Sequence, residues 1–175
     1  LFVGRLEVIK GLQDVIPAFG DDAPAELWIA GAGDYEPELR RLAEGRGKVR
    51  FLGYQSADRL RGLYRDAIAV IAPSLCYEVF PMVVLEAFRE STPLIARDLG
   101  PYPDIVAQSG GGVVFRDDDG LRAAIARYGA NPALARQEGC AGRNAFDRLW
   151  SEDAAMARYF EIIHETALKR GVDLG

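Results

Sequence analysis

Two glutamates stand eight positions apart in the stretch CYEVFPMVVLEAF, residues 76–88. Pro81 suits the first turn of a helix, so the sequence places Glu78 in a loop and Glu86 inside a helix with mostly apolar neighbours. A carboxylate in such surroundings is costly unless it is hydrogen-bonded or paired. Glu86 therefore needs a partner, which can be a buried Arg, backbone N–H groups, or two hydroxyls of a ligand such as a ribose diol.

Two cations stand near the start of the chain, in the stretch VGRLEVIKG. Arg5 follows the first apolar run, and Lys10 lies close to the start of the first predicted helix. Helix N-termini attract anions, so Arg5 and Lys10 could each bind one phosphate of a diphosphate. On this turn alone, two solvated surface charges explain the pattern equally well. No G-x-G-x-x-G or Walker A pattern occurs, which disfavours NAD binding and ATP hydrolysis.

Glycines follow two further apolar runs. Gly31 and Gly33, in IAGAGD, would let a ligand approach the backbone, although a tight corner between strand and helix is the simpler explanation. Gly53 ends another run, and Ser56 is placed to cap the helix that follows. Taken alone, these turns indicate structure rather than a site.

The elements that must position these residues alternate along the chain. Short apolar runs predict strands at 1–3, 27–30, 49–52, 68–72, 94–96 and 113–115. Helical patterns lie between and after them, at 12–19, 37–45, 56–67, 81–90, 120–129 and 151–170. This alternation predicts an α/β fold, a doubly wound, Rossmann-like six-stranded parallel sheet with helices on both faces. Ligands of such sheets bind beyond the carboxyl ends of the strands, where the turns described above lie.

Composition indicates a soluble globular domain and limits its partners. The chain has 175 residues, 26 of them acidic and 21 basic, without a cluster of Lys and Arg, so we expect no nucleic acid partner. No apolar run reaches the roughly 20 residues that cross a bilayer, and the start is no signal peptide, which predicts a cytoplasmic protein.

Cys76 and Cys140 show no metal or disulfide spacing and are expected to be reduced. The chain begins inside an apolar run without Met, which suggests a fragment of a longer protein.

Five stretches, in this order and spacing, resemble a known family: GRLEVIKG, GAGD, FLGYQSADRLRGLYRDA, APSLCYEVFPMVVLEAF and TPLIARDLGPYPDIV. They are similar to the carboxyl-terminal, donor-binding domain of the GT-B glycosyltransferases of family 4, over residues 1–169. The resemblance implies a nucleotide-sugar-binding domain at 1–150 and a terminal helix at 151–171 that crosses to an amino-terminal domain. It also implies a retaining glycosyltransferase of hexosyltransferase type, which transfers sugar from a nucleotide diphosphate sugar to an acceptor on that amino-terminal domain.

The resemblance also implies a role for each charged residue. Arg5 and Lys10 would bind the diphosphate and neutralise the leaving group, Glu78 would face the sugar, and Glu86 would hold the ribose hydroxyls. Arg5, Lys10 and Glu78 are thus the expected catalytic residues. The expected binding residues are Arg5, Lys10, Gly31, Gly33, Gly53, Phe80, Pro81, Met82, Val83 and Glu86.

The chain departs from the family beside Phe80, where Val79 and Pro81 replace the usual glycines. Because Pro81 has no backbone N–H, it cannot make the contact to sugar or phosphate that a glycine there often makes. Ser91 also replaces a usual glycine, to which we attach no function.

No cofactor or metal is expected, since GT-B enzymes generally need no metal ion for the donor diphosphate. The acidic stretch RDDDG at 116–120 is interpreted as a helix cap, because a helical pattern follows it. His164, among charged neighbours, is interpreted as a helix-surface residue.

Taken by itself, this chain is expected to bind the donor without transferring sugar. The full-length protein is expected in the cytoplasm or peripherally at the inner membrane. Half of a GT-B-type sugar-nucleotide epimerase or phosphorylase, and a non-catalytic nucleotide-binding module, remain as alternatives. In the last helix, Met156, Phe160 and Ile163 would lack partners, which favours self-association, while a monomer with this helix folded onto the domain fits equally well.

Overall fold

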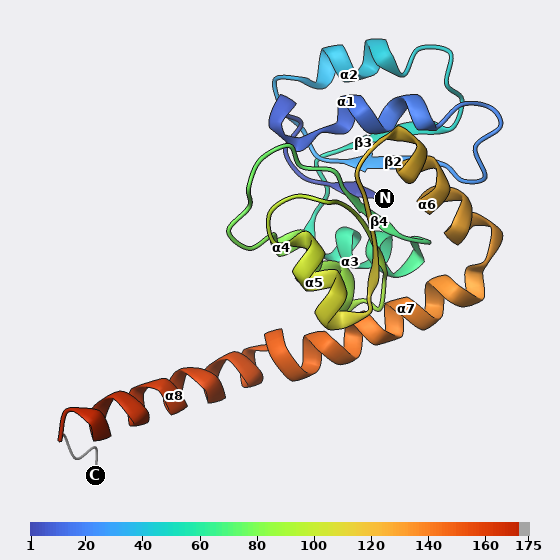
Figure 1. The fold of residues 1–175 in the computed structure, drawn as a ribbon. Helices are drawn as coiled ribbons and strands as arrows, with labels where there is room; N and C mark the ends of the chain where they lie inside the picture. The colour runs from blue at the N-terminus through green and yellow to red at the C-terminus, as the bar shows by residue number, and fades with distance from the viewer. Residues whose placement is uncertain (172–175) are drawn as a thin grey trace.

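Short parallel strands form the centre of the computed structural model, which describes residues 1–171 (Figure 1). These strands are β1 (Phe2–Val3), β2 (Leu27–Ala30), β3 (Val49–Gly53), β4 (Val70–Ala72), β5 (Leu94–Arg97) and β6 (Gly112–Phe115). Hydrogen bonds arrange them as two three-stranded parallel sheets, β1-β2-β3 and β4-β5-β6.

The two sheets meet at Leu1. Its backbone nitrogen donates to the Ala69 carbonyl at 3.0 Å, and its carbonyl accepts from the Ile71 N–H at 2.8 Å. The strands therefore follow the order β3-β2-β1-β4-β5-β6 across the molecule, which is the order of a doubly wound fold. The predicted fold class is confirmed, with the strand layer divided in the middle rather than continuously paired.

Helices connect the strands and extend the chain beyond them. The first connection contains the 3-10 turns η1 (Val8–Lys10) and η2 (Ile16–Ala18) on either side of α1 (Leu12–Val15). The later connections are α2 (Glu36–Leu42), α3 (Ala57–Asp66), α4 (Met82–Arg89) and α5 (Tyr102–Ser109). After β6 come α6 (Asp118–Ala130), α7 (Pro132–Ala145), the π-helical turn η3 (Phe146–Trp150) and α8 (Glu152–Lys169). The structure thus adds α5 and α7 to the helices predicted above.

One predicted helix, at 12–19, is shorter than expected. The α-helix ends at Val15, and the chain continues as a 3-10 turn that contains Pro17. Proline has no N–H to donate and its ring clashes with the preceding turn, so an α-helix cannot run regularly through this position.

An apolar core lies on each face of the strand layer. Side chains alternate along a strand, so Ile71 and Ile95 point into one core while Val70 and Leu94 point into the other. Helices α1, α2 and α6 contribute buried residues to the first core, and α3, α4 and α5 contribute to the second. Helices therefore cover both faces, as the sequence predicted.

Polar side chains begin several of these helices. Ser56 accepts a hydrogen bond from the Arg59 N–H at 3.4 Å, Asp117 from the Gly120 N–H at 2.8 Å, and Ser151 from the Ala154 N–H at 3.2 Å. The interpretation of the acidic stretch at 116–120 as a helix cap is confirmed. Within residues 1–171, no group of three or more His, Cys, Asp or Glu side chains could hold a metal ion.

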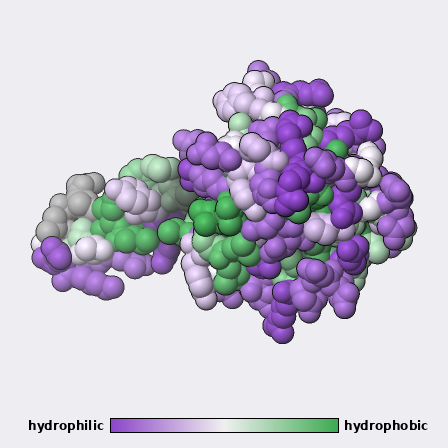
Figure 2. Space-filling model, turned by 90° about the horizontal axis from the view of Figure 1, so that it is seen from above, coloured by the Kyte–Doolittle hydropathy of each residue, from purple (hydrophilic) through white to green (hydrophobic). Residues whose placement is uncertain are grey.

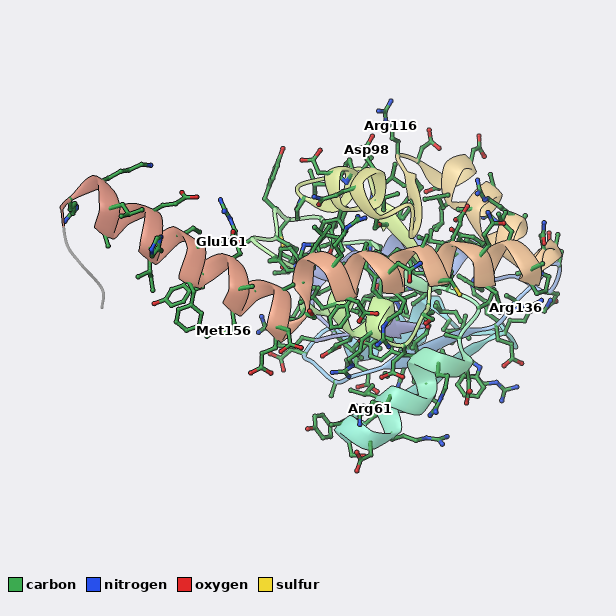
Figure 3. The ribbon with its side chains drawn as sticks, turned by 90° about the horizontal axis from the view of Figure 1, so that it is seen from below. Arg61, Asp98, Arg116, Arg136, Met156 and Glu161 are labelled. Carbon is green, nitrogen blue, oxygen red and sulfur yellow. The ribbon has the colours of Figure 1, made fainter. Side chains whose placement is uncertain are left out.

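Helix α8 projects away from the rest of the molecule (Figure 1). Figure 2 shows apolar side chains along it, and Figure 3 shows Met156 and Glu161 clear of the strands and their helices. Met156 and Phe160 are 44% and 59% exposed, Ile163 is half-buried, and His164 is exposed as predicted. The alternative in which this helix folds back onto the domain is therefore wrong. No described helix is long and apolar enough to cross a bilayer.

Candidate functional site

A cavity of about 350 Å³ opens at the carboxyl ends of β1 and β4. These two strands lie at the middle of the strand order, where the connections change direction and where doubly wound folds bind their ligands. The volume is within the usual range of small-molecule sites. The predicted site residues that line the cavity are Arg5, Lys10, Glu78, Phe80, Pro81, Met82, Val83 and Glu86.

The three remaining predicted residues, Gly31, Gly33 and Gly53, are not among the residues that line this cavity. A Cβ atom on Gly31 would lie 1.9 Å from the Gly4 carbonyl oxygen, and one on Gly33 would lie 2.3 Å from that of Leu6. Close packing against the turn that carries Arg5 therefore accounts for both glycines without a ligand. Contact between these glycines and a ligand stays a prediction.

Lys10 and Glu78 form an ion pair in the cavity. The Lys10 Nζ donates to the Glu78 Oε1 at 2.6 Å, and the two side chains are 24% and 22% exposed. Ser74 Oγ donates to the same oxygen at 3.0 Å. The hydrogen bond from Lys10 is the main reason why the pKa of Glu78 lies below its usual value of 4.5. Glu78 is therefore a carboxylate at neutral pH, and it holds the Lys10 cation at the cavity wall.

The segments that carry Lys10 and Glu78 are packed tightly against each other. Gly11, with φ of 74°, follows Lys10, and a Cβ there would lie 2.1 Å from the Pro73 carbonyl oxygen. The Leu75 N–H also donates to the Ile9 carbonyl at 2.8 Å. The turns after β1 and after β4 are thus fixed relative to each other, so the ion pair does not depend on side-chain contact alone.

Arg97, at the end of β5, joins the turn after β4 to helix α1. Its Nε donates to the Pro73 carbonyl at 2.9 Å, and its Nη2 lies 2.7 Å from the Asp14 Oδ2 on α1. Sequence reasoning did not select Arg97, or the cavity-lining residues Ser74 and Tyr102. The available signal was that Arg97 directly follows a predicted strand and that Ser74 lies two residues after one.

Arg5 is placed differently from Lys10. Its side chain is 74% exposed, and its Nη1 pairs with the Glu7 Oε1 at 2.6 Å. Exposed ion pairs contribute little free energy because water screens them. Arg5 can therefore give up its bond to Glu7 and bind a more highly charged anion that enters the cavity.

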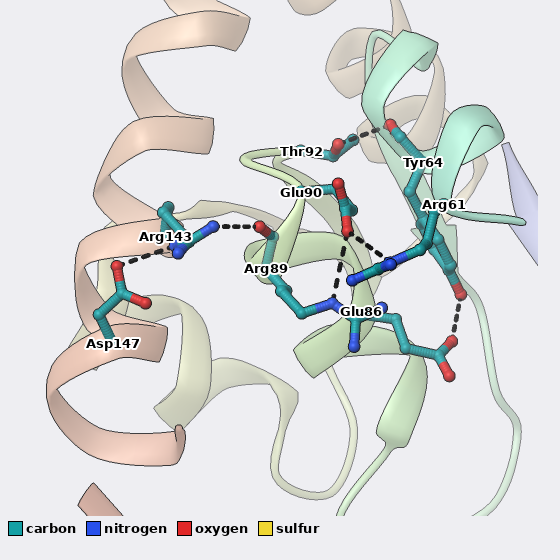
Figure 4. Close-up of polar contacts among 8 residues, drawn as sticks. All are labelled: Arg61, Tyr64, Glu86, Arg89, Glu90, Thr92, Arg143 and Asp147. Carbon is teal, nitrogen blue, oxygen red and sulfur yellow. Dashed lines mark hydrogen bonds and ion pairs between the residues drawn. The ribbon is translucent and has the colours of Figure 1, made fainter. Parts of the chain in front are cut away.

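Glu86, on α4, has a hydrogen-bond donor for one of its two carboxylate oxygens. The Tyr64 hydroxyl, on α3, donates to Oε2 at 2.5 Å, and no ion pair of Glu86 occurs in residues 1–171 (Figure 4). The nearby cations Arg61 and Arg89 lie instead 3.7 and 3.4 Å from Glu90. The alternative that a buried Arg satisfies Glu86 is therefore wrong, and the partner within the chain is a tyrosine.

The Lys10–Glu78 pair predicts a pH dependence of stability. Because folding lowers the pKa of Glu78, the pair stabilises the protein above the usual value of 4.5 and loses this contribution as the pH falls through the lowered value. We expect the difference in free energy of unfolding between the native chain and Glu78→Gln to be constant near neutrality and to shrink in acid. Urea unfolding between about pH 3 and pH 7 measures it. A difference that grows on acidification would contradict the assignment.

A second cavity, of about 340 Å³, lies at the opposite ends of the strands, where Leu1 and Ala69 line it. Most of its lining is apolar, including Phe19, Ile95 and Tyr128. None of the predicted site residues lines it. Glu26, Arg59 and Asp66 also line this second cavity, so what sets the first cavity apart is that it gathers the predicted site residues.

A family model described as Glycosyl transferases group 1 matches residues 1–145 of this chain. The glycogen synthase of Mycobacterium tuberculosis is 34% identical over 152 residues, which are 82% of this chain and 36% of that protein. The chain spans about a third of the length of the curated relatives it matches, with 30% and 36% for the first of them.

Two of the solved structures that match this chain illustrate the shared fold. The sucrose-phosphate synthase of Thermosynechococcus elongatus matches with a TM-score of 0.81 and 27% identity, over 96% of this chain and 46% of that one. The HepE protein of Anabaena, solved in complex with UDP, matches with a TM-score of 0.82 and 20% identity, over 94% and 48% of the two chains. Both likenesses extend over nearly all of the strands and helices described above.

Proposed function

This chain belongs to the glycosyl transferases group 1 family, and on that premise we propose that its cavity binds a nucleotide diphosphate sugar as the donor of a glycosyl transfer. One observation carries the proposal. Two cations, Arg5 and Lys10, line a single cavity of about 350 Å³ at the carboxyl ends of the strands. Glu86, whose carboxylate can accept hydrogen bonds from ribose hydroxyls, lines the same cavity. Diphosphate and ribose are the two parts that ribonucleoside diphosphate sugars share, whatever their base and sugar.

The cavity suits a diphosphate for electrostatic reasons. Lys10 lies in its wall and Arg5 contributes a more exposed cation. Met82 and Val83, at the start of α4, also line it, and the N-terminal end of a helix favours an anion. During transfer, negative charge develops on the departing diphosphate, and these fixed positive groups would stabilise it. In this proposal the chain's own cations do the work for which other transferases use a metal ion.

Glu78 has a second task in the proposed reaction. It holds Lys10 from one side of the cavity, and Ser74 orients the same carboxylate oxygen. A phosphate that binds Lys10 would share that cation with Glu78, and the carboxylate would then face the sugar beside the phosphate. From the resemblance of the sequence, we also propose that the transfer retains the configuration at the sugar and that the protein belongs to glycosyltransferase family 4.

The rest of the reaction belongs to a part of the protein beyond this chain, in our proposal. An amino-terminal domain would bind the acceptor and close over the donor, and α8 would reach towards it. The relatives' length supports this arrangement, since the chain spans 36% of the glycogen synthase that it matches. In the full-length protein, dependence of sugar release on an acceptor would separate transfer from epimerisation.

The proposal predicts that this chain binds nucleoside diphosphates more tightly than the matching nucleosides, because Arg5 and Lys10 act on phosphate. Calorimetry with uridine, guanosine and adenosine diphosphates and with the three nucleosides measures the difference. We expect at least one diphosphate to bind more than tenfold tighter, with affinity that falls as salt is added. A ligand at 100 times its Kd should also add about 2.7 kcal/mol of stability in a thermal scan. Equal affinities for every diphosphate and its nucleoside would contradict the assignment.

A further inference from the structure

The hydrogen bond between Tyr64 and Glu86 uses one carboxylate oxygen and leaves the other free. Tyr64 donates to Oε2 at 2.5 Å, while Oε1 accepts no hydrogen bond within the described residues. Glu86 lines the cavity and is half-buried. A carboxylate whose two oxygens are equally free can rotate, whereas a donor on one oxygen fixes the plane of the group.

Tyr64, which donates this hydrogen bond, is held in a fixed position by its own contacts. Tyr64 is 1% exposed and belongs to the core that α3, α4 and α5 share. Thr92 Oγ1 donates to the Tyr64 backbone carbonyl at 2.6 Å, which ties α3 to the segment that follows α4 (Figure 4). Burial and the neighbouring carboxylate both raise the pKa of Tyr64, so its hydroxyl remains a donor at every physiological pH.

We propose that Tyr64 is a positioning residue that orients Glu86 so that its free oxygen selects ribose over sugars without the 2′ and 3′ hydroxyls. This inference rests on the proposed function, because it concerns the same cavity. Tyr64 itself is buried behind Glu86 and acts through that carboxylate rather than by touching the ligand.

The Tyr64→Phe variant tests this role because it removes only the hydroxyl. The ring keeps its place in the core, and the bond from Thr92 goes to the backbone carbonyl, which the substitution leaves intact. We expect the preference for ribonucleoside diphosphates over their 2′,3′-dideoxy forms to fall about three- to tenfold, less than the loss of a whole hydrogen bond to a charged group, because the Glu86 carboxylate itself remains. Affinity for the dideoxy forms should stay unchanged.

Tyr128→Phe is a matched control. Tyr128 is also 1% exposed, and its hydroxyl donates to the carboxylate of Glu138, between α6 and α7 and away from this cavity. The two substitutions therefore remove the same kind of bond from the same kind of environment. We expect both to lower stability in urea, and only Tyr64→Phe to change the preference for ribose.

The measurement is a calorimetric titration of the native chain and both variants with uridine, guanosine and adenosine diphosphates and their dideoxy forms. A native chain that binds none of the diphosphates would overturn the proposed function, and this inference with it. If the native chain binds them but shows no preference for ribose, or if Tyr64→Phe keeps the full preference, the inference fails and diphosphate binding stands.

The same titrations distinguish a role of the Tyr64 hydroxyl in ribose selection from a purely structural effect. Equal losses for ribo and dideoxy ligands in Tyr64→Phe, or the same loss of preference in Tyr128→Phe, would show that the hydroxyl only supports the fold. In a Glu86→Gln background, which already lacks the carboxylate, Tyr64→Phe should lower the preference by much less than it does in the native chain. An undiminished effect there would overturn the pairing of the two residues in function.

Discussion

The Lys10→Met variant is expected to lose about a hundredfold in affinity for a nucleoside diphosphate, about 2.7 kcal/mol, while its affinity for the nucleoside stays unchanged. Two effects add in the same direction. The variant lacks the cation that the phosphates would contact, and it leaves the Glu78 carboxylate unpaired in the same cavity, where it repels them. Calorimetric titration with a diphosphate and its nucleoside measures both affinities.

Two further variants separate these effects. Lys169→Met removes a cation of the same type from the exposed end of α8 and should change neither affinity. The double variant Lys10→Met/Glu78→Gln removes the repulsion as well as the attraction, so it should bind the diphosphate more tightly than Lys10→Met alone. If Lys10→Met weakened the nucleoside as much as the diphosphate, Lys10 would support the cavity's shape rather than bind phosphate.

The Glu86→Gln variant is expected to lose about thirtyfold in affinity for a ribonucleoside diphosphate, about 2 kcal/mol, because a charged acceptor of ribose hydroxyls becomes neutral. The unliganded protein should lose at most about 1 kcal/mol of stability. The Tyr64 hydroxyl can donate to the amide oxygen of glutamine as it does to the carboxylate, and no cation is left unpaired by the change. Urea unfolding and titration with ribo and dideoxy ligands measure the two quantities.

Glu90→Gln is the matched control for this substitution. Glu90 follows directly after α4, lies within 4 Å of Arg61 and Arg89, and does not line the cavity. Its substitution should leave nucleotide affinity unchanged. A loss of several kcal/mol of stability in Glu86→Gln, with equal binding of ribo and dideoxy ligands, would show that Glu86 is a structural residue.

The class of fold could be predicted because its signals are local. Alternating apolar runs and helical patterns each extend over a few residues, and burial on both faces of a parallel sheet requires those runs to be apolar. The convergence of the charged candidates was also predictable, since ligands of such sheets bind beyond the carboxyl ends of the strands and Arg5, Lys10 and Glu78 lie in the connections that follow the first and fourth predicted strands. The cavity indeed gathers these residues.

The meaning of the glycines was less predictable from local pattern. Gly31 and Gly33 match a ligand-binding turn in sequence, yet the structure accounts for them by the approach of the Gly4 and Leu6 carbonyl oxygens. The strand order brings those oxygens there, since β1 pairs with β2. In the sequence alone, a glycine that makes room for the backbone of a neighbouring turn cannot be distinguished from a glycine that makes room for a ligand.

The sequence by itself determined that Glu86 would need a partner, because an apolar helix leaves a carboxylate without water. Only the tertiary structure decided that the partner is Tyr64 rather than an Arg. Tyr64 and Glu86 are 22 residues apart and meet because α3 and α4 cover the same face of the strand layer. The Lys10–Glu78 pair spans 68 residues in the same way, through the contact of β1 with β4. Such pairings depend on strand order and on how helices pack, which the local periodicity that predicts each element does not specify.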